Sequence, residues 1–557
     1  MAGSKGDELV FVPLGGVGEI GMNLALYGYG PAGRREWIMV DCGVTFPGPD
    51  LPGVDLVLPD IGYLAEERKN LRAVVITHAH EDHYGALADL WPGLNVPIFV
   101  SPFTAGMLEA KRSYEKGRER LPVTIYRAGE RFRAGPFEVE AVAVNHSIPE
   151  PVSLALRSPL GTIVHSGDWK IDAAPALGPL TNEKRFRELG DEGVLALMCD
   201  STNAMRDGVS PSEEEVGESL ERIIAEAKGR VAVTTFSSNV GRIRSVARAA
   251  REAGREVLLL GSSIRRVVDV ATEVGLMEGV GPFIAEDEYG FIPRDKVVVI
   301  LTGSQGEPRA ALARLSRDEM RHVALSPGDT VIFSSRTIPG NERAIIDIKN
   351  GLIEQGIRIV TDADALVHVS GHPRRSELQR MYEWVRPEIL VPVHGEAAHL
   401  TAQADLARRS GIRQVPRVRN GDMLRLAPGA AEKIDEVPFG RIYKDGRLIG
   451  DYEEMGIAER RKLSFVGHVA VNVTLDGRYE LLRDPDVAQQ GLPVFDEEGD
   501  DMSDVLYDAA VGAIESIPRP RRKDLDTVRE AVRRSVRAAA AEVWGKKPVV
   551  TVFVTKV

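Results

Sequence analysis

The chain has few of the features that mark secreted, membrane-spanning or strongly basic proteins. Its two cysteines, Cys42 and Cys199, are too few for a disulfide framework, and no apolar run approaches membrane-spanning length. The N-terminal residues lead into a strand-like segment without the apolar core of a signal peptide, so we expect a cytoplasmic protein. Basic residues are not in excess, since 70 Lys and Arg against 82 Asp and Glu leave a net charge of −12. This balance argues mildly against a polyanionic partner unless arginines line a groove locally. At 557 residues and 43% hydrophobic composition, the chain is long enough for two to four globular domains.

Histidine is also scarce, but three of the eleven copies fall together at His78, His80 and His83. They follow the apolar run Val74-Val75-Ile76, and Asp82 lies among them. Imidazole and carboxylate groups are ligands that zinc accepts, and a tight turn can aim them at two adjacent points. The segment therefore predicts a metal-binding turn at the end of a strand. The alternative is a polar loop of solvated histidines.

Further candidate ligands follow other apolar runs. Asp41 follows Trp37–Val40, and His394 follows Ile389–Val393; His146 and Asp168 occupy similar positions after their own apolar segments. Loops at one edge of an α/β sheet commonly assemble a functional site, so we expect these side chains to converge. Taken singly, each has another explanation: Asp41 and Asp168 as turn formers beside glycine, and His146 as a hydrogen-bonded core histidine.

A glycine-rich segment near the N-terminus matches the spacing of a dinucleotide-binding fingerprint. Gly16-Val17-Gly18-Glu19-Ile20-Gly21 follows the strand-like Leu9–Val12, with Asp41 further on. That fingerprint requires a helix after the glycines, whereas residues 23–30 alternate in polarity and contain further glycines. We therefore expect a strand here, with the glycines forming a turn close to the site.

In order and residue type, Asp41, His78-x-His80-x-Asp82-His83, His146 and Asp168 resemble the metallo-β-lactamase superfamily. Three later motifs resemble those of the β-CASP nucleases: Cys199-Asp200-Ser201-Thr202-Asn203, Ser370-Gly371-His372 and Pro392-Val393-His394-Gly395. Essentially the whole chain resembles the ribonuclease J family, which are RNA-decay enzymes of bacteria and archaea. A histidine at position 394 is typical of the RNA-processing branch.

The resemblance implies an α/β fold in which a metallo-β-lactamase αββα sandwich is interrupted by a Rossmann-like β-CASP domain and followed by a small C-terminal α/β domain. Repeated strand, loop and helix patterns between about 230 and 362 independently indicate a parallel sheet. The expected boundaries are 1–205 and 365–445 for the split nuclease domain, 206–364 for the insertion, 446–462 for a linker, and 463–557 for the C-terminal domain.

The activity implied is two-metal hydrolysis of RNA, as a 5′-to-3′ exonuclease favouring 5′-monophosphate RNA and as an endonuclease, in rRNA processing and mRNA decay. We expect two Zn²⁺ per chain, and the carboxylates also suit Mn²⁺ or Mg²⁺ as an activating metal. The expected ligands are His78, His80 and His146 at one metal, Asp82, His83 and His394 at the other, and Asp168 between them. Asp41 would orient these ligands.

The resemblance also implies catalytic roles beyond the ligands. His372 is the expected proton donor to the leaving 3′-oxygen, with Asp200 orienting it, and Asp82 is grouped with them as catalytic. His368 and Ser370 are candidates to hold the scissile phosphate. For His368, it is an equal alternative that the residue simply ends a strand and has no role in phosphate binding.

Small hydroxyl residues and arginines follow the strands expected between 230 and 362. Such loops can bind phosphate through backbone amides at helix N-termini and through guanidinium groups. Ordinary strand-to-helix turns with N-caps are the alternative. The candidates are Ser237, Ser238, Ser262, Arg265, Ser304, Gln305, Gly306, Ser335 and Arg336.

Single-stranded RNA is the partner we expect, with no membrane, and the resemblance implies a homodimer or homotetramer. Two other functions stay open. A hydrolase of small thioesters or lactams would share the histidine turn but leaves the inserted sheet unexplained. A noncatalytic RNA-binding protein with structural zinc is the second alternative.

Overall fold

The computed structural model describes residues 6–115, 119–338 and 340–557. Its contacts divide the chain into two compact units. The first consists of residues up to 45 together with 58–441, and the second of 46–57 together with 442–557. Among the helices of these described residues, none is both long and apolar enough to cross a membrane.

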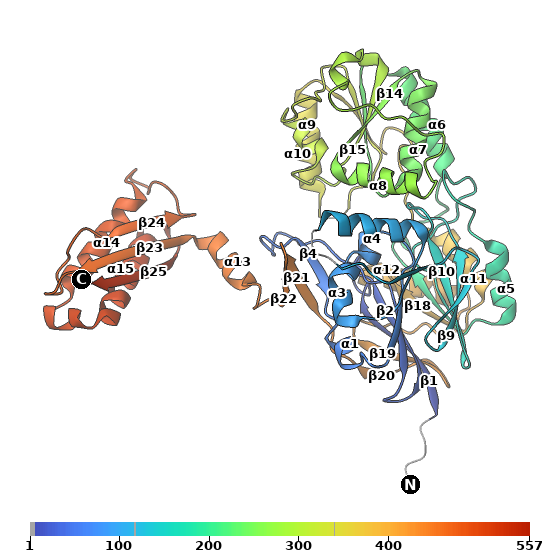
Figure 1. Ribbon diagram of the computed structural model, residues 1–557, viewed down its shortest axis with the longest axis horizontal. Coiled ribbons are helices and arrows are strands. Elements are labelled where there is room, and N and C mark those ends of the chain that lie inside the picture. The colour runs from blue at the N-terminus through green and yellow to red at the C-terminus, as the bar shows by residue number, and fades with distance from the viewer. Residues whose placement is uncertain (1–5, 116–118, 339) are drawn as a thin grey trace, which may run out of the picture. The chain divides into compact units, whose positions relative to one another are not determined.

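Two β-sheets form the centre of the first unit (Figure 1). One runs in the order β20 (Glu432–Glu436), β19 (Asp422–Ala427), β1 (Asp7–Gly15), β2 (Leu24–Pro31), β3 (Glu36–Val40), β5 (Leu71–Val75), β6 (Ile98–Val100) and β7 (Val123–Ile125). The other runs in the order β18 (Ile389–Val393), β12 (Ala196–Asp200), β11 (Gly161–His165), β10 (Val152–Ser158), β9 (Phe137–Ala143) and β8 (Arg131–Ala134). Strand β2 occupies the place where a dinucleotide fingerprint would require a helix.

The main core lies between these sheets, because apolar side chains of both contribute to one buried cluster. Phe11 and Val75 come from the first sheet, and Leu154 and Ile389 from the second. The other side of the second sheet packs against helices α5 (Glu183–Glu192), α11 (Arg375–Val385) and α12 (Ala397–Arg409). Short helices α2 (Glu81–Tyr84) and α3 (Leu87–Leu94) and the longer α4 (Pro102–Tyr114) follow strands β5 and β6 of the first sheet, and the short helix α1 (Gly62–Glu66) precedes β5.

The inserted domain is a parallel sheet with helices between its strands. Its strand order is β14 (Glu256–Leu260), β15 (Val297–Leu301), β13 (Val231–Thr234), β16 (Thr330–Phe333) and β17 (Arg358–Val360). Its helices are α6 (Glu213–Glu226), α7 (Val240–Glu252), α8 (Ser262–Glu273), α9 (Ala311–Ser316) and α10 (Glu342–Glu354), with 3₁₀ turns at Tyr289–Phe291 and Arg294–Lys296. These strands are apolar on both faces, as expected for a sheet covered on both sides.

The insertion interrupts the second sheet in sequence but not in space. Strand β18 pairs in parallel with β12, although the whole inserted domain separates them along the chain. Strand β19 likewise returns to pair with the N-terminal strand β1. Residues from both sides of the insertion therefore meet at one sheet edge.

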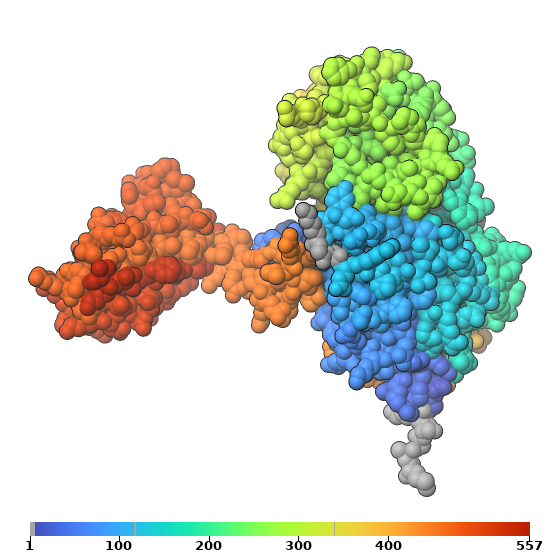
Figure 2. Space-filling view, in the orientation of Figure 1, coloured from blue at the N-terminus to red at the C-terminus, as the bar shows by residue number. Residues whose placement is uncertain are grey.

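Helix α4, which follows β6 of the first sheet, packs against helix α8 of the inserted domain. Gly106 allows this close approach, since a Cβ atom at that position would lie 2.5 Å from Val270 Cγ1. The guanidinium of Arg266 also lies 4.1 Å from the ring centroid of Tyr114. Figure 2 shows the blue surface around α4 meeting the green surface of the inserted domain.

The second unit has its own core. Strands β24 (Asp486–Gln490), β23 (His468–Leu475) and β25 (Val549–Lys556) form its sheet, and helices α14 (Met502–Ser516) and α15 (Leu525–Trp544) contribute to the same apolar cluster. Val528, Val532 and Val536 recur every four residues on α15 and are fully buried, as expected for the apolar face of an amphipathic helix. A 3₁₀ turn spans Arg519–Lys523.

The segment expected as a linker contains regular structure. Strands β21 (Arg441–Asp445) and β22 (Leu448–Gly450) form an antiparallel pair, and helix α13 spans Ile457–Val466. Residues 46–57 also group with this unit, because Asp55 N donates to Lys444 O and Asp55 Oδ2 accepts from Gly446 N. Strand β4 (Leu56–Pro59) follows directly in sequence.

Candidate metal centre

The histidine turn lies between strand β5 and helix α2. Thr77 and His78 lie two and three residues after the strand, His80 is the N-cap residue of the helix, and His83 lies within it. Gly43 packs against the backbone of this turn, since a Cβ atom there would lie 1.7 Å from Asp82 O. Only glycine permits that approach.

Two of the expected residues at strand ends adopt left-handed backbone conformations. Asp41 after β3 has φ +63°, and His394 after β18 has φ +53°. Non-glycine residues rarely adopt this conformation, and it is concentrated at functional sites. Here it turns each side chain away from its strand and toward the histidine cluster, where His83 Nδ1 lies 2.7 Å from Asp41 Oδ2.

The first group of candidate ligands consists of His78, His80, His146 and Asp168. His80 Nδ1 lies 3.2 Å from His78 Nε2 and 3.0 Å from His146 Nε2. Asp168 Oδ2 lies 3.6 Å from His146 Nε2. Each residue thus directs one potential ligand atom at a common point.

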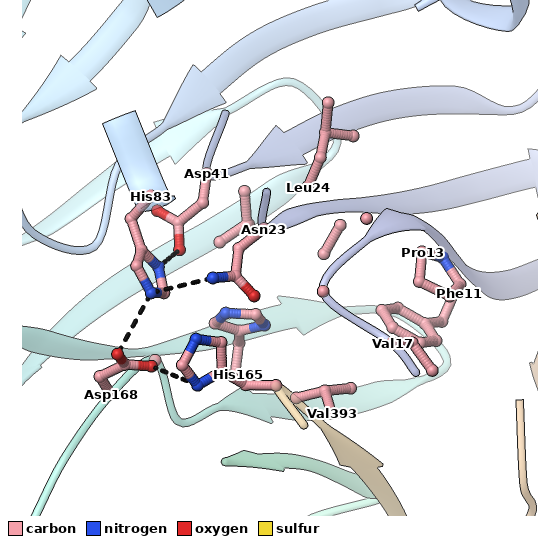
Figure 3. Close-up of a pocket in the computed structure, with 16 residues that line it drawn as sticks. Phe11, Pro13, Val17, Asn23, Leu24, Asp41, His83, His165, Asp168 and Val393 are labelled. Carbon is pink, nitrogen blue, oxygen red and sulfur yellow. Dashed lines mark hydrogen bonds and ion pairs between the residues drawn. The ribbon is translucent and has the colours of Figure 1, made fainter. Parts of the chain in front are cut away.

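The second group consists of Asp82, His83, His394 and the same Asp168. Asp82 Oδ2 lies 3.7 Å from His83 Nε2 and 3.3 Å from His394 Nε2. Asp168 Oδ2 lies 3.2 Å from His83 Nε2, as the dashed line in Figure 3 shows. Asp168 is therefore common to both groups.

The nitrogen atoms that face away from these groups have hydrogen-bond partners. His146 Nδ1 donates to the carbonyl oxygen of Gly371 at 2.7 Å. His83 Nδ1 pairs with Asp41, and His78 Nδ1 lies 3.0 Å from Thr77 Oγ1, which itself bonds to Asp41. Such partners fix ring orientation and leave the opposite nitrogen available as a ligand.

Burial keeps the first group of histidines neutral. It lowers the pKa of His80 to about 4, with neighbouring imidazoles contributing, and it is also the main cause that lowers the pKa of His78 and His146. Unprotonated nitrogens therefore face one another at about hydrogen-bond distance, an arrangement that a shared cation would stabilise.

The second group has the opposite electrostatic character. Burial opposes protonation of His83 and His394, but the surrounding carboxylates, Asp168 foremost, outweigh it and raise the pKa of both, that of His394 to about 10. Positive charge at this point offsets the buried carboxylates, which is also what a divalent cation does. Among the described residues, Asp168 Oδ1 is buried with no partner in hydrogen-bond geometry, and its nearest charged neighbour is His394 Nδ1 at 3.4 Å. Donor types and burial together fit a pair of divalent cations.

His372 lies beside the two groups, in the loop before α11. Its Nδ1 lies 2.7 Å from Asp200 Oδ2, at the end of β12. Burial opposes its protonation, but the carboxylates of Asp200 and Asp168 outweigh it and raise the pKa of His372. Asp168, Asp200, His372 and His394 also form a third group with metal-ligand spacing. The geometry alone is thus compatible with a proton donor or a ligand at His372.

Thr202 and Asn203 are residues near the site to which the sequence pattern assigned no role. Thr202 Oγ1 lies 2.9 Å from His394 Nδ1. Asn203 Nδ2 donates to Ser370 Oγ at 2.9 Å and to His372 O at 3.0 Å, which ties the two ends of that loop together. Their sequence signal is their place in the motif that runs from Cys199 to Asn203.

Three arginines gather next to Asn203. Arg336 NH1 lies 3.4 Å from Asn203 Oδ1. Partial burial and then the neighbouring Arg206 lower the pKa of Arg336, and partial burial and Arg374 likewise lower the pKa of Arg206. Mutually repelling guanidinium groups next to a loop of the site are suited to bind a phosphate. Arg206 and Arg374 did not stand out in the sequence, although Arg374 closely follows His372.

The other expected phosphate-binding residues lie in different surroundings. Ser262 is exposed at the start of α8, after the edge strand β14, and Arg265 is ion-paired with Glu286. Gln305 is buried and donates to Arg336 O at 2.8 Å, so it supports the arginine loop. Ser304 and Ser335 are also buried. Gly306 has φ +83° against Ala344, which permits the turn.

His368 and the serine pair after β13 complete the expected set. Within the described residues, His368 Nδ1 is buried without a hydrogen-bond partner, and burial together with Arg242 and Lys170 lowers its pKa to about 3. Ser237 is half-buried, whereas Ser238 Oγ lies 3.2 Å from His80 Nε2.

Comparison with known protein families agrees with this architecture. Residues 29–258 match the metallo-beta-lactamase superfamily, and 228–352 match the ribonuclease J beta-CASP domain. Residues 356–415 match a Zn-dependent metallo-hydrolase RNA specificity domain, and 455–557 match the ribonuclease J C-terminal domain. The expected fold class is thereby confirmed.

Several curated proteins are similar over nearly the full length. Ribonuclease J of Sinorhizobium meliloti is 74% identical, covering 100% of this chain and 98% of the relative. Ribonuclease J of Thermus thermophilus is 34% identical, covering 98% and 96%. A crystal structure of a protein of unknown function from Enterococcus faecalis matches with a TM-score of 0.51 at 17% identity, covering 75% of this chain and 100% of that one, which supports the fold alone. On the full-length identity and the four family matches, the chain belongs to the ribonuclease J family.

Proposed function

We propose that this protein is a metal-dependent ribonuclease that hydrolyses RNA phosphodiester bonds from 5′ to 3′, favouring 5′-monophosphate ends, and that also cleaves internally. The observation that carries the proposal is the pair of four-residue ligand groups that share Asp168. A family match described as an RNA specificity domain supports RNA as the substrate.

The proposed ligands are His78, His80 and His146 in one group and Asp82, His83 and His394 in the other, with Asp168 common to both. Two zinc ions would suit this set, since imidazole dominates it, and the carboxylates also accept Mn²⁺ or Mg²⁺. When bound, such cations supply a hydroxide nucleophile at neutral pH and offset charge on the transferring phosphate.

Protein side chains account for the remaining steps. Asp41 holds His83 in orientation, and Asp200 holds His372 through Nδ1. The opposite nitrogen of a protonated His372 can then donate a proton to the leaving 3′-oxygen. Asn203 keeps Ser370 and the backbone of His372 next to each other, so that the phosphate-holding and proton-donating groups share one rigid loop.

The proposal is tested by incubating the purified protein with 5′-labelled and 3′-labelled RNA side by side. We expect chelation to abolish hydrolysis and added divalent cation to restore it, with short products released from the 5′ end first. Hydrolysis that persists in metal-free protein would contradict the two-metal scheme. Turnover of a thioester or lactam without RNA cleavage would favour the small-molecule alternative, and retained zinc without any turnover would favour a structural role.

The preference for a 5′-monophosphate depends in our proposal on the cluster formed by Arg206, Arg336 and Arg374. We expect Arg336→Met to reduce the rate ratio between 5′-monophosphate and 5′-hydroxyl RNA about tenfold, since a charge-assisted hydrogen bond contributes roughly 1.5–3 kcal/mol. Single-turnover rates on the two RNAs measure this ratio. Arg343→Met, an exposed arginine of the same domain that pairs with Asp347, is the matched control. An unchanged ratio in Arg336→Met would remove this cluster from end recognition.

The state of assembly, expected to be a homodimer or homotetramer, and the cytoplasmic location stay predictions. Mass photometry of the purified protein would measure the first.

A further inference from the structure

One hydrogen bond to the candidate metal centre comes from the inserted domain. Ser238 Oγ lies 3.2 Å from His80 Nε2, with both side chains half-buried. Ser238 follows strand β13, whereas His80 belongs to the turn after β5. The contact therefore joins the two domains at a candidate ligand.

The contacts of His80 determine which of its ring nitrogens presents a lone pair to a cation and which carries the proton. Its Nδ1 lies near His78 Nε2 and His146 Nε2, and His146 has its proton on Nδ1, where it donates to Gly371 O. His80 Nδ1 must therefore present a lone pair if the three rings are to share a cation. A neutral ring then carries its proton on Nε2, and Ser238 Oγ accepts it.

The position of Ser238 is itself well determined. Its carbonyl accepts Val240 N at 2.9 Å, and the Asn239 side chain caps helix α7 by accepting Arg242 N at 2.9 Å. The fully buried guanidinium of Arg242 bonds to Glu213 at 2.7 Å and to Val367 O at 2.9 Å.

The same network reaches the loop that carries Asp168. Glu213 N donates to Asp172 Oδ2 at 3.0 Å, and Lys170 Nζ lies 2.7 Å from that carboxylate and 3.7 Å from Glu213 Oε1. Buried charges paired in this way resist separation, because removing one partner leaves the other uncompensated. These interactions thus hold the hydroxyl of Ser238 in a constant position relative to the loop that carries Asp168.

We propose that Ser238 is a positioning residue for the metal centre, whose hydroxyl accepts the proton of His80 Nε2 and so aims His80 Nδ1 at the first ligand group. The inserted domain then contributes a hydrogen-bond partner to a ligand of the nuclease domain. The affinity of the first ligand group for a cation therefore depends on how the inserted domain packs against the nuclease domain. The inference rests on the proposed function for the role of His80 as a ligand. It also gives Ser238 a task other than the phosphate binding expected from its sequence context.

The test measures zinc affinity of the full-length apoprotein by competition with a chromophoric chelator. Partners of this kind contribute about ten- to a hundredfold to metal affinity, so we expect Ser238→Ala to weaken one of two zinc-binding steps about tenfold and leave the other unchanged. Ser238→Thr, which keeps the hydroxyl, should restore most of the affinity. Ser245→Ala removes a hydroxyl from the helix that follows Ser238, α7, where among the described residues it bonds within the helix to Gly241 O, and is the matched control.

A weakening of only one zinc-binding step would indicate a positioning role for Ser238. A general structural defect would instead weaken both zinc-binding steps or change the far-ultraviolet circular dichroism. Unchanged zinc affinity in Ser238→Ala, equal weakening of both steps, or a loss confined to binding of 5′-phosphorylated RNA would overturn the inference. His80→Ala distinguishes its failure from that of the proposed function. If His80→Ala still binds two zinc ions tightly, the proposed ligand set is wrong. If His80→Ala loses one zinc ion while Ser238→Ala binds both as tightly as the unchanged protein, only the role of Ser238 is wrong.

Discussion

We expect Asp168→Asn to lower RNA turnover by on the order of a thousandfold or more and to weaken both zinc-binding steps. Asp168 is the residue common to both ligand groups, and its Oδ2 lies within 3.9 Å of His78, His83 and His146. The amide keeps the size of the side chain but removes the negative charge that two cations would share. Several kcal/mol of charge stabilisation are at stake, and each 1.4 kcal/mol is a factor of ten in rate.

Zinc content after dialysis and single-turnover rates on labelled RNA measure these two effects. Asp191→Asn, an exposed carboxylate on α5 that pairs with Arg386, should change neither and is the matched control. Circular dichroism should show an intact fold in both variants. If Asp168→Asn keeps two tightly bound zinc ions, Asp168 does not join the two groups, and the proposed ligand set would need to be redrawn.

We expect His372→Gln to lower turnover by about 10²–10⁴, the usual contribution of a general acid, and to leave the zinc content unchanged. The leaving 3′-oxygen of RNA is strongly basic and needs a proton, and in our proposal His372, which is bonded to Asp200, donates it. A phosphodiester with a nitrophenolate leaving group needs no such proton. On bis(p-nitrophenyl) phosphate, the same variant should therefore lose far less activity than on RNA.

The two substrates together test the role, because a structural defect would lower both rates alike. His322→Gln, an exposed histidine of the inserted domain, is the control. Loss of zinc in His372→Gln would instead make His372 a ligand, which the third group of Asp168, Asp200, His372 and His394 would accommodate. Equal losses on both substrates would likewise exclude the proton-donor role.

The expected ligands could be named from sequence because their signals are local. His78, His80, Asp82 and His83 occupy one turn, and His146, Asp168 and His394 each follow an apolar strand, as does Asp41, which is expected to orient the ligands. Strand ends of neighbouring strands meet at one edge, so proximity follows from the order of elements. The same logic placed the insertion, since alternating strands and helices favour a separate parallel sheet.

The partners of these residues could not be predicted in the same way. Ser237 and Ser238 are indistinguishable in sequence, and only the tertiary arrangement brings one of them to His80 Nε2. Arg265 and Arg336 both follow a serine-containing loop, yet β14 is an edge strand while β16 lies next to the central β13. Strand order is set by non-local packing, and a single sequence does not encode it in any local pattern.

The split of the nuclease domain has a consequence for the protein during its synthesis. Strand β18 and His394, like His372, emerge from the ribosome only after the inserted domain, and the pairing of β18 with β12 must wait for them. A growing chain can present His78, His80 and His83 long before it can finish the centre. We therefore expect a nascent chain that ends before His394 to lack a complete metal centre and to have no hydrolytic activity toward its own messenger.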